Sequence, residues 1–330
     1  MQNQLQIPSR HHLVEHAAFA KAGVQVFVKR EDEIHKAISG NKWRKLKYNL
    51  ESLSASGKAG FATFGGAFSN HLAAAAYAGF LSKKEMLGFV RGEEADLANP
   101  TLAFAQACGM QLIRLTRKEY AQKNDVGFLE KWQAEFPNYL FIPEGGCNLL
   151  GVQGCTEILP ETQIDFDMVA CPMGTATTFS GLLLSANTQT ELLGFPAVKG
   201  GDYLRADVNN FIASAKSTGL VPPTFTTAKW QLQTDFHFGG FGKINAELVQ
   251  FMNEFYAETN IPLDPIYTAK MFYGLVEMAK AEEFEKGTKI LAIHTGGLQG
   301  IKGMNHRLRN KGFQINYEEI IDSAFPNPRA

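Results

Sequence analysis

The sequence predicts an α/β protein of two domains, each an open, mostly parallel twisted sheet with helices on both faces. Short apolar runs alternate with segments of helical periodicity along most of the chain, which is the order that parallel sheets require. A glycine-rich stretch at residues 144–151 interrupts this alternation and is predicted to cross between domains. With 330 residues available, we expect a small domain at 51–150 and a large one formed by 1–50 and 151–330.

The elements before the glycine-rich stretch follow from apolar period, caps and turn residues. Alternating valines predict a strand at 24–28, and a helix is predicted to begin near Gly40 or Asn41, with Ser39 as its N-cap. Further strands are predicted at 61–64, 86–90, 111–115 and 139–142, and helices at 71–79, 100–108 and 126–136. Beyond the stretch, strands are predicted at 167–171, 191–198, 228–234 and 289–293, and helices at 179–186, 204–216, 243–256 and 268–281.

Composition narrows the classes of function. Lys and Arg total 32 against 33 Asp and Glu, so a net charge of -1 leaves no bulk field for nucleic acid or an anionic membrane. The four cysteines show no CxxC spacing, so neither a disulfide framework nor a metal site is indicated. No run reaches the length of a membrane span and the N-terminus lacks a signal-peptide pattern, so we expect a cytoplasmic protein with a small-molecule substrate.

Lys42 is the first candidate catalytic residue. It falls in the first turn of the predicted helix, on the same side as Leu46, Asn49 and Leu53. The helix N-terminus and partial burial both disfavour its positive charge, so both lower its pKa and favour a nucleophilic amine. The alternative is a surface lysine in a basic helical face, together with Arg44, Lys45 and Lys47.

A candidate phosphate site lies between the strand at 167–171 and the helix at 179–186. Small residues let the backbone approach an anion, hydroxyls add donors, and the helix end adds partial positive charge. The stretch matches neither the P-loop nor the dinucleotide fingerprint, so it predicts a cup for a single phosphate group. An ordinary tight turn with N-capping threonines is the alternative. The residues are Gly174, Thr175, Ala176, Thr177 and Thr178.

Two further loops carry polar groups to the same predicted sheet edge. Ser69, Asn70 and His71 stand where a glycine turn meets a helix, a place suited to holding a carboxylate or activating a serine. His71 taken alone is more typical of a capping or packing histidine. Thr295 follows the last predicted strand and places a hydroxyl at its carboxyl end.

Taken in order, these motifs resemble the D-cysteine desulfhydrase and 1-aminocyclopropane-1-carboxylate deaminase family, over about residues 8 to 310. The matching segments are KRED at 29–32, SGNKxRKL at 39–46, GGxxSNH at 65–71 and TGG at 295–297. The resemblance implies the fold of the tryptophan synthase β-subunit (fold type II), pyridoxal 5′-phosphate as cofactor, and a homodimer.

The resemblance also implies roles for individual residues. Lys42 would be the Schiff-base lysine, Asn70 would hold the O3′ oxygen of the cofactor, and Thr295 would face its pyridine nitrogen. The loop from Gly174 to Thr178 would bind the phosphate. Ser69 and Tyr267 would be catalytic with Lys42. The implied substrate-binding residues are Ser69, Asn70, His71, Phe241, Tyr267 and Thr268.

The chain departs from the family pattern near the substrate. Thr268 stands where the deaminases carry a glutamate, which favours β-elimination from D-cysteine over opening of a cyclopropane ring. Phe241 replaces a second active-site tyrosine, and Phe68 replaces a glutamine. We therefore expect a lyase that forms a keto acid, ammonia and sulfide from a small amino acid. The alternatives are the deaminase and, in another class, a non-catalytic protein that binds the cofactor or another phospho-ligand.

Overall fold

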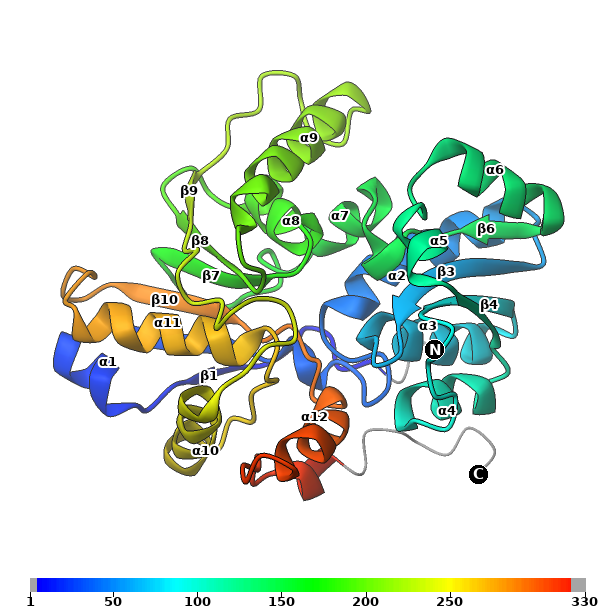
Figure 1. Cartoon of the computed structure of the whole chain (residues 1–330). Helices are drawn as coiled ribbons and strands as arrows, with labels where there is room; N and C mark the ends of the chain where they lie inside the picture. Colours follow the sequence, from blue (N-terminus) through cyan, green and yellow to red (C-terminus); the bar gives the residue numbers. More distant parts are fainter. Residues whose placement is uncertain (1–4, 322–330) are drawn as a thin grey trace.

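The computed structural model describes residues 5–321 and contains two sheets (Figure 1). The larger sheet has the order β1-β2-β10-β7-β8-β9, in which only the β1–β2 pair is antiparallel. Its strands are β1 (His11–Leu13), β2 (Gln25–Lys29), β7 (Met168–Met173), β8 (Glu191–Pro196), β9 (Lys229–Leu232) and β10 (Lys289–Ile293). The smaller sheet is wholly parallel, in the order β5-β4-β3-β6. Its strands are β3 (Gly60–Gly66), β4 (Glu85–Arg91), β5 (Gln111–Leu115) and β6 (Tyr139–Phe141).

Helices connect and cover these strands, as the alternating pattern predicts. The α-helices are α1 (Ala17–Ala22), α2 (Asn41–Ala55), α3 (Asn70–Ser82), α4 (Pro100–Ala107), α5 (Arg117–Ala121), α6 (Val126–Glu135), α7 (Leu149–Cys155), α8 (Thr177–Ser185), α9 (Leu204–Ser217), α10 (Ala246–Thr259), α11 (Thr268–Lys280) and α12 (Gly300–Arg309). Short 3-10 turns lie at Glu31–Glu33, Glu144–Gly146, Gly201–Tyr203 and Glu318–Ile321.

Both faces of each sheet are apolar and buried. In β10, Ile290 and Ala292 join the cluster formed with α10 and α11, whereas Leu291 and Ile293 join the cluster formed with α8 and α9. The smaller sheet does the same, since Phe61 packs toward α2, α3 and α4 while its neighbours face α6. Successive side chains of a strand point to opposite faces, so a continuous apolar run fills both cores.

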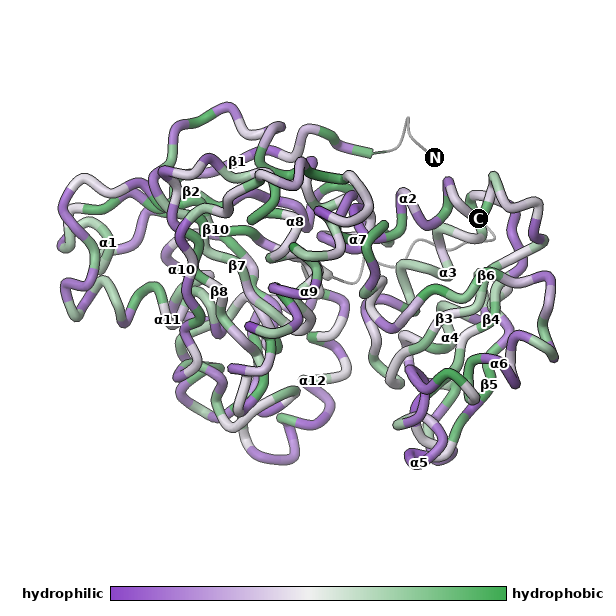
Figure 2. Tube along the Cα trace, turned by 90° about the horizontal axis from the view of Figure 1, so that it is seen from above, coloured by the Kyte–Doolittle hydropathy of each residue, from purple (hydrophilic) through white to green (hydrophobic). Residues whose placement is uncertain are grey.

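Helix α2 lies between the two sheets, beside α7 (Figures 1 and 2). Its apolar residues, among them Leu46 and Leu53, pack in the core of the smaller sheet, although its N-terminus lies at the end of β10. We propose that 51–150 and 1–50 with 151–330 form two domains that share this helix. Its position places the first turn, with Lys42, between the two halves of the molecule.

The start of α2 differs from the prediction. Gly40, rather than Ser39, is the N-cap, with φ of 68°, and the Ser39 hydroxyl donates instead to the carbonyl of Asp32 at 3.0 Å. A Cβ atom on Gly40 would lie 1.9 Å from the carbonyl oxygen of Thr295. Glycine is required there because both the positive φ and the close approach to the loop after β10 exclude a side chain.

Several short elements were not predicted, namely β1, α1, α5, α7 and α12. The stretch 144–151 is not a plain crossing, because it holds a 3-10 turn and then the start of α7, which Asn148 caps by accepting from the Gly151 N–H at 2.9 Å. Within 5–321, no helix is both long and apolar enough to cross a membrane. The same residues contain no cluster of His, Cys, Asp or Glu that could hold a metal ion.

Candidate functional site

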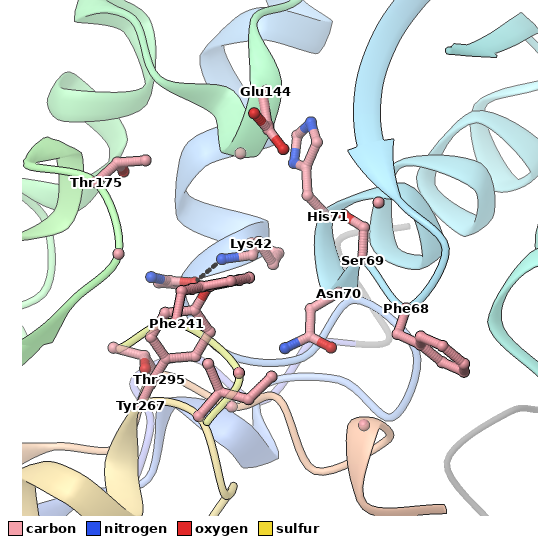
Figure 3. Close-up of a pocket in the computed structure, with 18 of the residues that line it drawn as sticks. Lys42, Phe68, Ser69, Asn70, His71, Glu144, Thr175, Phe241, Tyr267 and Thr295 are labelled. Atoms are coloured by element: carbon pink, nitrogen blue, oxygen red, sulfur yellow. Dashed lines mark hydrogen bonds between the residues drawn. The ribbon is translucent and has the colours of Figure 1, made fainter. Parts of the chain in front are cut away.

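A cavity of about 560 Å³ lies where the carboxyl ends of β3, β7 and β10 meet the first turn of α2. This is the edge at which open α/β sheets bind their ligands. Figure 3 shows residues from both halves of the molecule around it. Most of the predicted site residues line this cavity: Lys42, Ser69, Asn70, His71, Gly174, Thr175, Thr178, Phe241, Tyr267 and Thr295.

Lys42 is held by its neighbour in the sequence. Its Nζ donates to Asn41 Oδ1 at 2.7 Å, and Lys42 makes no ion pair within residues 5–321. Burial, and next the positive charge of Lys45, lower the pKa of Lys42 to about 7. The amine is therefore substantially neutral, and so nucleophilic, at physiological pH.

Asn41 links this amine to the predicted phosphate loop. Its Nδ2 donates to Thr178 Oγ1 at 2.8 Å while its Oδ1 accepts from Lys42. The two partners of one amide group thus come from the first turn of α2 and from the start of α8. A single small molecule that fills the cavity can reach both the amine of Lys42 and the loop at 174–178.

The loop at 174–178 faces a buried cation. Lys45 is 3% exposed, its Nζ donates to Thr175 Oγ1 at 3.3 Å, and it pairs with no carboxylate among the described residues. A buried charge without a counter-charge is costly, so this position favours an anion in the cavity. The N-terminus of α8 adds partial positive charge from the same side.

Gly174 keeps this corner open. A Cβ atom on Gly174 would lie 2.6 Å from the ring of Tyr267, so no larger residue fits between the loop and that ring. The nucleophilic amine of Lys42 suits an aldehyde, and the cation of Lys45 beside the narrow loop at Gly174 suits a phosphate group. Together these residues fit an aldehyde that carries a phosphate group.

Three predicted residues do not line the cavity. Ala176 and Thr177 are buried at the start of α8, and the Thr177 hydroxyl lies 3.0 Å from that of Thr175, so their side chains belong to the helix packing. Thr268 is also fully buried: its hydroxyl donates to Asp264 Oδ2 at 2.8 Å, where Asp264 caps the start of α11. Helix capping thus directs the Thr268 hydroxyl to Asp264 rather than to the cavity, and its contact with the substrate stays a prediction.

Ser69 and Asn70 stand at the N-terminus of α3, on the opposite wall. The Ser69 hydroxyl is the N-cap and accepts from the Leu72 N–H at 3.2 Å. The Asn70 side chain accepts from Gln299 Nε2 at 2.6 Å, which leaves its Nδ2 free to act as a donor. Both residues line the cavity, as predicted from the glycine turn that precedes them.

His71 is neutral, and its hydrogen bonds fix its tautomer. Thr63 donates its hydroxyl hydrogen to the carbonyl of Ile142 at 2.9 Å, so the 2.8 Å contact between Thr63 Oγ1 and His71 Nε2 requires the ring to donate. Burial, then the charges of Lys42 and Lys45, lower the pKa of His71 to about 3. Nδ1 is left as a buried acceptor with no partner in the described chain.

Aromatic rings form the outer part of the wall. Phe241 packs edge-on against Tyr267, with centroids 6.1 Å apart, and is 57% exposed. Burial, then the carboxylates of Asp264 and Glu144, raise the pKa of the Tyr267 phenol, so it keeps its proton at neutral pH. Phe68 is 46% exposed at the side of the cavity that α12 covers.

Sequence reasoning missed three residues that shape the site. Asn41 bridges the amine and the loop, Lys45 supplies the unpaired cation, and Gln299 orients Asn70. The spacing of Lys45, three residues after Lys42, indicates a shared helix face. No local signal identifies Gln299, because it reaches Asn70 from a loop 229 residues away.

Comparison with known proteins supports this assignment. A family model described as "Pyridoxal-phosphate dependent enzyme" matches residues 8–296. A Pyrococcus horikoshii protein named "Putative 1-aminocyclopropane-1-carboxylate deaminase" is 30% identical over 84% of this chain and 86% of the relative. The "Bifunctional D-cysteine desulfhydrase/1-aminocyclopropane-1-carboxylate deaminase, mitochondrial" of Arabidopsis thaliana is 26% identical over 84% of this chain and 74% of the relative.

The fold agrees as well. The crystal structure of an ACC deaminase homologue matches with a TM-score of 0.78 at 26% identity, over 97% of this chain and 95% of the other. The predicted fold and cofactor are therefore confirmed. The family match covers most of the chain, and the cavity places a reactive lysine beside an anion cradle. This chain therefore belongs to the pyridoxal-phosphate-dependent enzymes.

Proposed function

We propose that this protein is a D-cysteine desulfhydrase-type lyase, which eliminates a β-thiol from a small amino acid to give a keto acid, ammonia and sulfide. The cofactor is supported by the pair of hydrogen bonds made by Asn41, which brings the Lys42 amine and the loop at 174–178 to one cavity. Such a pairing of amine and anion cradle suits a phosphorylated aldehyde cofactor. The choice of elimination is supported by the neutral hydroxyl of Thr295 on the cavity wall, since a carboxylate facing the ring nitrogen would favour ring opening.

The residues that would hold pyridoxal phosphate follow from the cavity. The Lys42 amine would bind the aldehyde carbon, and Lys45, Thr175, Thr178 and the backbone at 174–178 would bind the phosphate. Asn70 Nδ2 would donate to the ring hydroxyl, and Thr295 would face the ring nitrogen with a neutral hydroxyl. When bound, the cofactor supplies a sink for the electron pair left at Cα when its proton is removed.

Lys42 and Tyr267 then divide the proton chemistry. Once the substrate amine has displaced it from the aldehyde carbon, the Lys42 amine, with a pKa of about 7, would accept the Cα proton of the substrate and later deliver it to Cβ of the product. The phenol of Tyr267 stays protonated, so it can donate to the sulfur as the Cβ–S bond breaks. Water then replaces the nitrogen of the remaining carbon skeleton. This step releases ammonia and leaves a keto acid.

The N-terminus of α3 would bind the substrate carboxylate. Ser69 and Asn70 offer a hydroxyl and an amide there, and the partial positive charge of the helix end favours an anion. His71 lines the cavity beside them, and its neutral ring places no second charge next to the carboxylate.

Opening of a cyclopropane ring is the second candidate, because the Pyrococcus relative carries that activity in its name. Thr268, the residue at which the sequence favours elimination, is hydrogen-bonded to Asp264 and does not line the cavity, so its influence on the choice between the two reactions would be indirect. Glu144 is the one carboxylate among the described residues that line the cavity, and its Oε1 accepts from the Tyr120 hydroxyl at 2.8 Å.

The test uses one preparation of the cofactor-loaded protein. D-cysteine, L-cysteine and 1-aminocyclopropane-1-carboxylate are supplied separately, and keto acid, ammonia and sulfide are measured together with the absorbance spectrum. We expect sulfide and keto acid in equal amounts from D-cysteine. Keto acid from the cyclopropane alone identifies the deaminase, whereas a coloured protein that turns over none of the three contradicts both proposals.

A homodimer and a cytoplasmic location stay predictions of the sequence. Light scattering of the purified protein checks the first, and fractionation of cells that express the chain checks the second.

A further inference from the structure

The loop at 237–242, which leads from β9 toward α10, has an unusual backbone. Phe238 has φ of 52°, and Gly239, Gly240 and Gly242 have φ of 88°, 117° and 65°. Two successive turns form it: the Gly240 N–H donates to the carbonyl of His237 at 3.0 Å, and the Lys243 N–H donates to that of Gly240 at 3.1 Å. The turns share Gly240, and Phe241 is the second residue of the second turn. Backbone of this kind persists only where its surroundings hold it.

Lys270 of α11 provides that hold. It is 1% exposed, and its Nζ donates to the carbonyls of Gly240 at 2.8 Å, His237 at 2.9 Å and Ala197 at 3.2 Å. An ammonium has three N–H groups, and all three are used. Two of the acceptors are the carbonyls that open the two turns, and the second of these turns contains Phe241.

The charge of Lys270 is part of this arrangement. Burial lowers its pKa to about 8, against the opposing effect of Asp264, so the group is mainly protonated at neutral pH. Within residues 5–321, Lys270 forms no ion pair, and its three hydrogen-bond acceptors are all backbone carbonyls. A neutral amine has only two N–H groups, and methionine has none, so either would leave buried carbonyls without a donor.

The loop and Lys270 meet again at the cavity. Tyr267, three residues before Lys270, contacts the Phe241 ring edge-on. In Figure 3 both rings lie on the same side of the cavity as Lys42. The segment 267–270 therefore contacts the loop in two ways: Lys270 binds the loop backbone, and Tyr267 contacts the ring of Phe241.

We propose that Lys270 is a positioning residue: by binding the carbonyls of His237, Gly240 and Ala197, it fixes the loop at 237–242 and keeps Phe241 over the cavity that holds Lys42. The claim about the loop depends on the structure alone. The claim that this placement controls access to the reacting groups rests on the proposed function. Nothing in the local sequence marks Lys270, since lysine at this position of an amphipathic helix otherwise predicts a solvent-facing residue.

The first experiment measures hydrogen exchange by mass spectrometry in the holoenzyme. In Lys270→Met we expect peptides covering 237–243 to exchange about tenfold faster or more, while peptides from β7, α8 and the smaller sheet stay within about twofold of the wild type. Lys280→Met is the matched control, because Lys280 lies on the same helix but is exposed and pairs with Glu277 at 2.8 Å. Exchange unchanged at 237–243, or faster throughout the chain, overturns the proposal.

Should Lys270→Met fail to fold, Lys270→Gln takes its place. Its amide keeps two N–H donors but no charge, and we expect about threefold faster exchange at 237–243 or more. An unchanged loop in Lys270→Gln equally overturns the role assigned to the ammonium.

The second experiment asks whether Lys270 acts through Phe241. Hydroxylamine removes bound pyridoxal phosphate, so its rate reports access to the cavity. We expect Lys270→Met and Phe241→Ala each to speed removal about fivefold, and the double variant to be no faster than the faster single one. A multiplied effect, about 25-fold, overturns the proposal. A protein that takes up no cofactor refutes the proposed function, whereas the same exchange comparison, made on the protein without cofactor, still decides the role of Lys270.

Discussion

The basic residues at 42–47 lie on two sides of α2, and the two sides differ in whether carboxylates contact them. On one side, Arg44 is fully buried between Glu31 at 2.9 Å and Glu161 at 2.6 Å, and Lys47 pairs with Glu157. On the other side, Lys42 and Lys45 face the cavity and meet no carboxylate within the described chain.

This difference separates anchoring from chemistry. Arg44 ties α2 to the turn after β2 through buried Glu31 and to the segment after α7 through Glu161, so the helix is held where its first turn meets the cavity. Among the described residues, Lys42 and Lys45 contact no carboxylate. The pKa of Lys42 is therefore low, and Lys45 can bind an anion in the cavity. Residues far away in the sequence thus decide which cations of α2 are structural and which are reactive: those that meet carboxylates anchor the helix, and those that face the cavity are available for chemistry.

The largest effect tests the reactive half. Lys42→Ala should abolish covalent binding of pyridoxal phosphate and lower turnover by at least about 10³-fold, because it removes both the nucleophile and the base. Absorbance of the loaded protein and sulfide release are the measurements. Lys47→Ala, on the same helix, should keep both. A Lys42→Ala protein that retains the wild-type spectrum and turnover contradicts the assignment of this residue.

The next effect tests the anchoring half. Arg44→Met leaves Glu31, which is fully buried, without its cation, and should lower the free energy of unfolding by about 3–5 kcal/mol. Urea unfolding followed by circular dichroism measures it. A loss below about 1 kcal/mol would mean that Arg44 does not anchor α2.

Lys45→Met should weaken cofactor binding rather than the fold. Loss of one charged hydrogen bond to the phosphate is worth about 1.5–3 kcal/mol, or roughly a 10- to 100-fold higher Kd. Titration of the apoprotein with pyridoxal phosphate, followed by fluorescence, gives the Kd. If Lys45→Met and Lys47→Met bind equally well, the phosphate does not lie beside Lys45.

The pH dependence of cofactor uptake links the two cavity lysines. Lys42 has its pKa lowered to about 7, so its neutral, reactive form grows as pH rises through 7, and the rate of uptake by the apoprotein should rise with it. Removing the neighbouring cation in Lys45→Met should move this midpoint upward, since repulsion no longer disfavours protonated Lys42. A midpoint near the ordinary value of 10.5 in the wild type would contradict the burial of Lys42.

The smallest effect is expected at Lys47. Its pair with Glu157 is partly solvated, so Lys47→Met should change the free energy of unfolding by about 0–1 kcal/mol. Urea unfolding of Lys47→Met and Arg44→Met under the same conditions compares the two losses in the free energy of unfolding. A loss as large as that of Arg44→Met would show that burial does not separate the two anchoring pairs.

Most long elements could be predicted, because apolar period and caps are local. The strands at 111–115 and 289–293 have the predicted bounds, and α3 begins one residue before the prediction because Ser69 is its cap. Helices α1 and α5, of six and five residues, are too short to show a period. Glycines interrupt the pattern of α7, so packing rather than propensity forms it, whereas Ile301, Met304 and Leu308 give α12 a helical period that could have predicted it.

At the site, the motifs predicted which residues gather at the cavity but not what each one contacts. Ser69, Asn70, His71 and Thr295 all line it, as their positions at strand and helix ends predict. Thr268 does not, because its hydroxyl completes a helix cap with Asp264, a choice that the sequence leaves open. The tautomer of His71 likewise depends on Thr63 and Ile142, whose hydrogen bonds exist only in the folded sheet.

By itself, the sequence determined the α/β class, the order of the elements and the loops that carry reactive groups, because strand and helix period, caps and glycine turns act over a few residues. The tertiary structure alone decided that Arg44 meets Glu161, 117 residues away, and that Asn41 meets Thr178, 137 residues away. Periodicity fixes the side on which a residue lies, but the charge and hydrogen-bonding capacity of what faces it come from segments that only folding brings near.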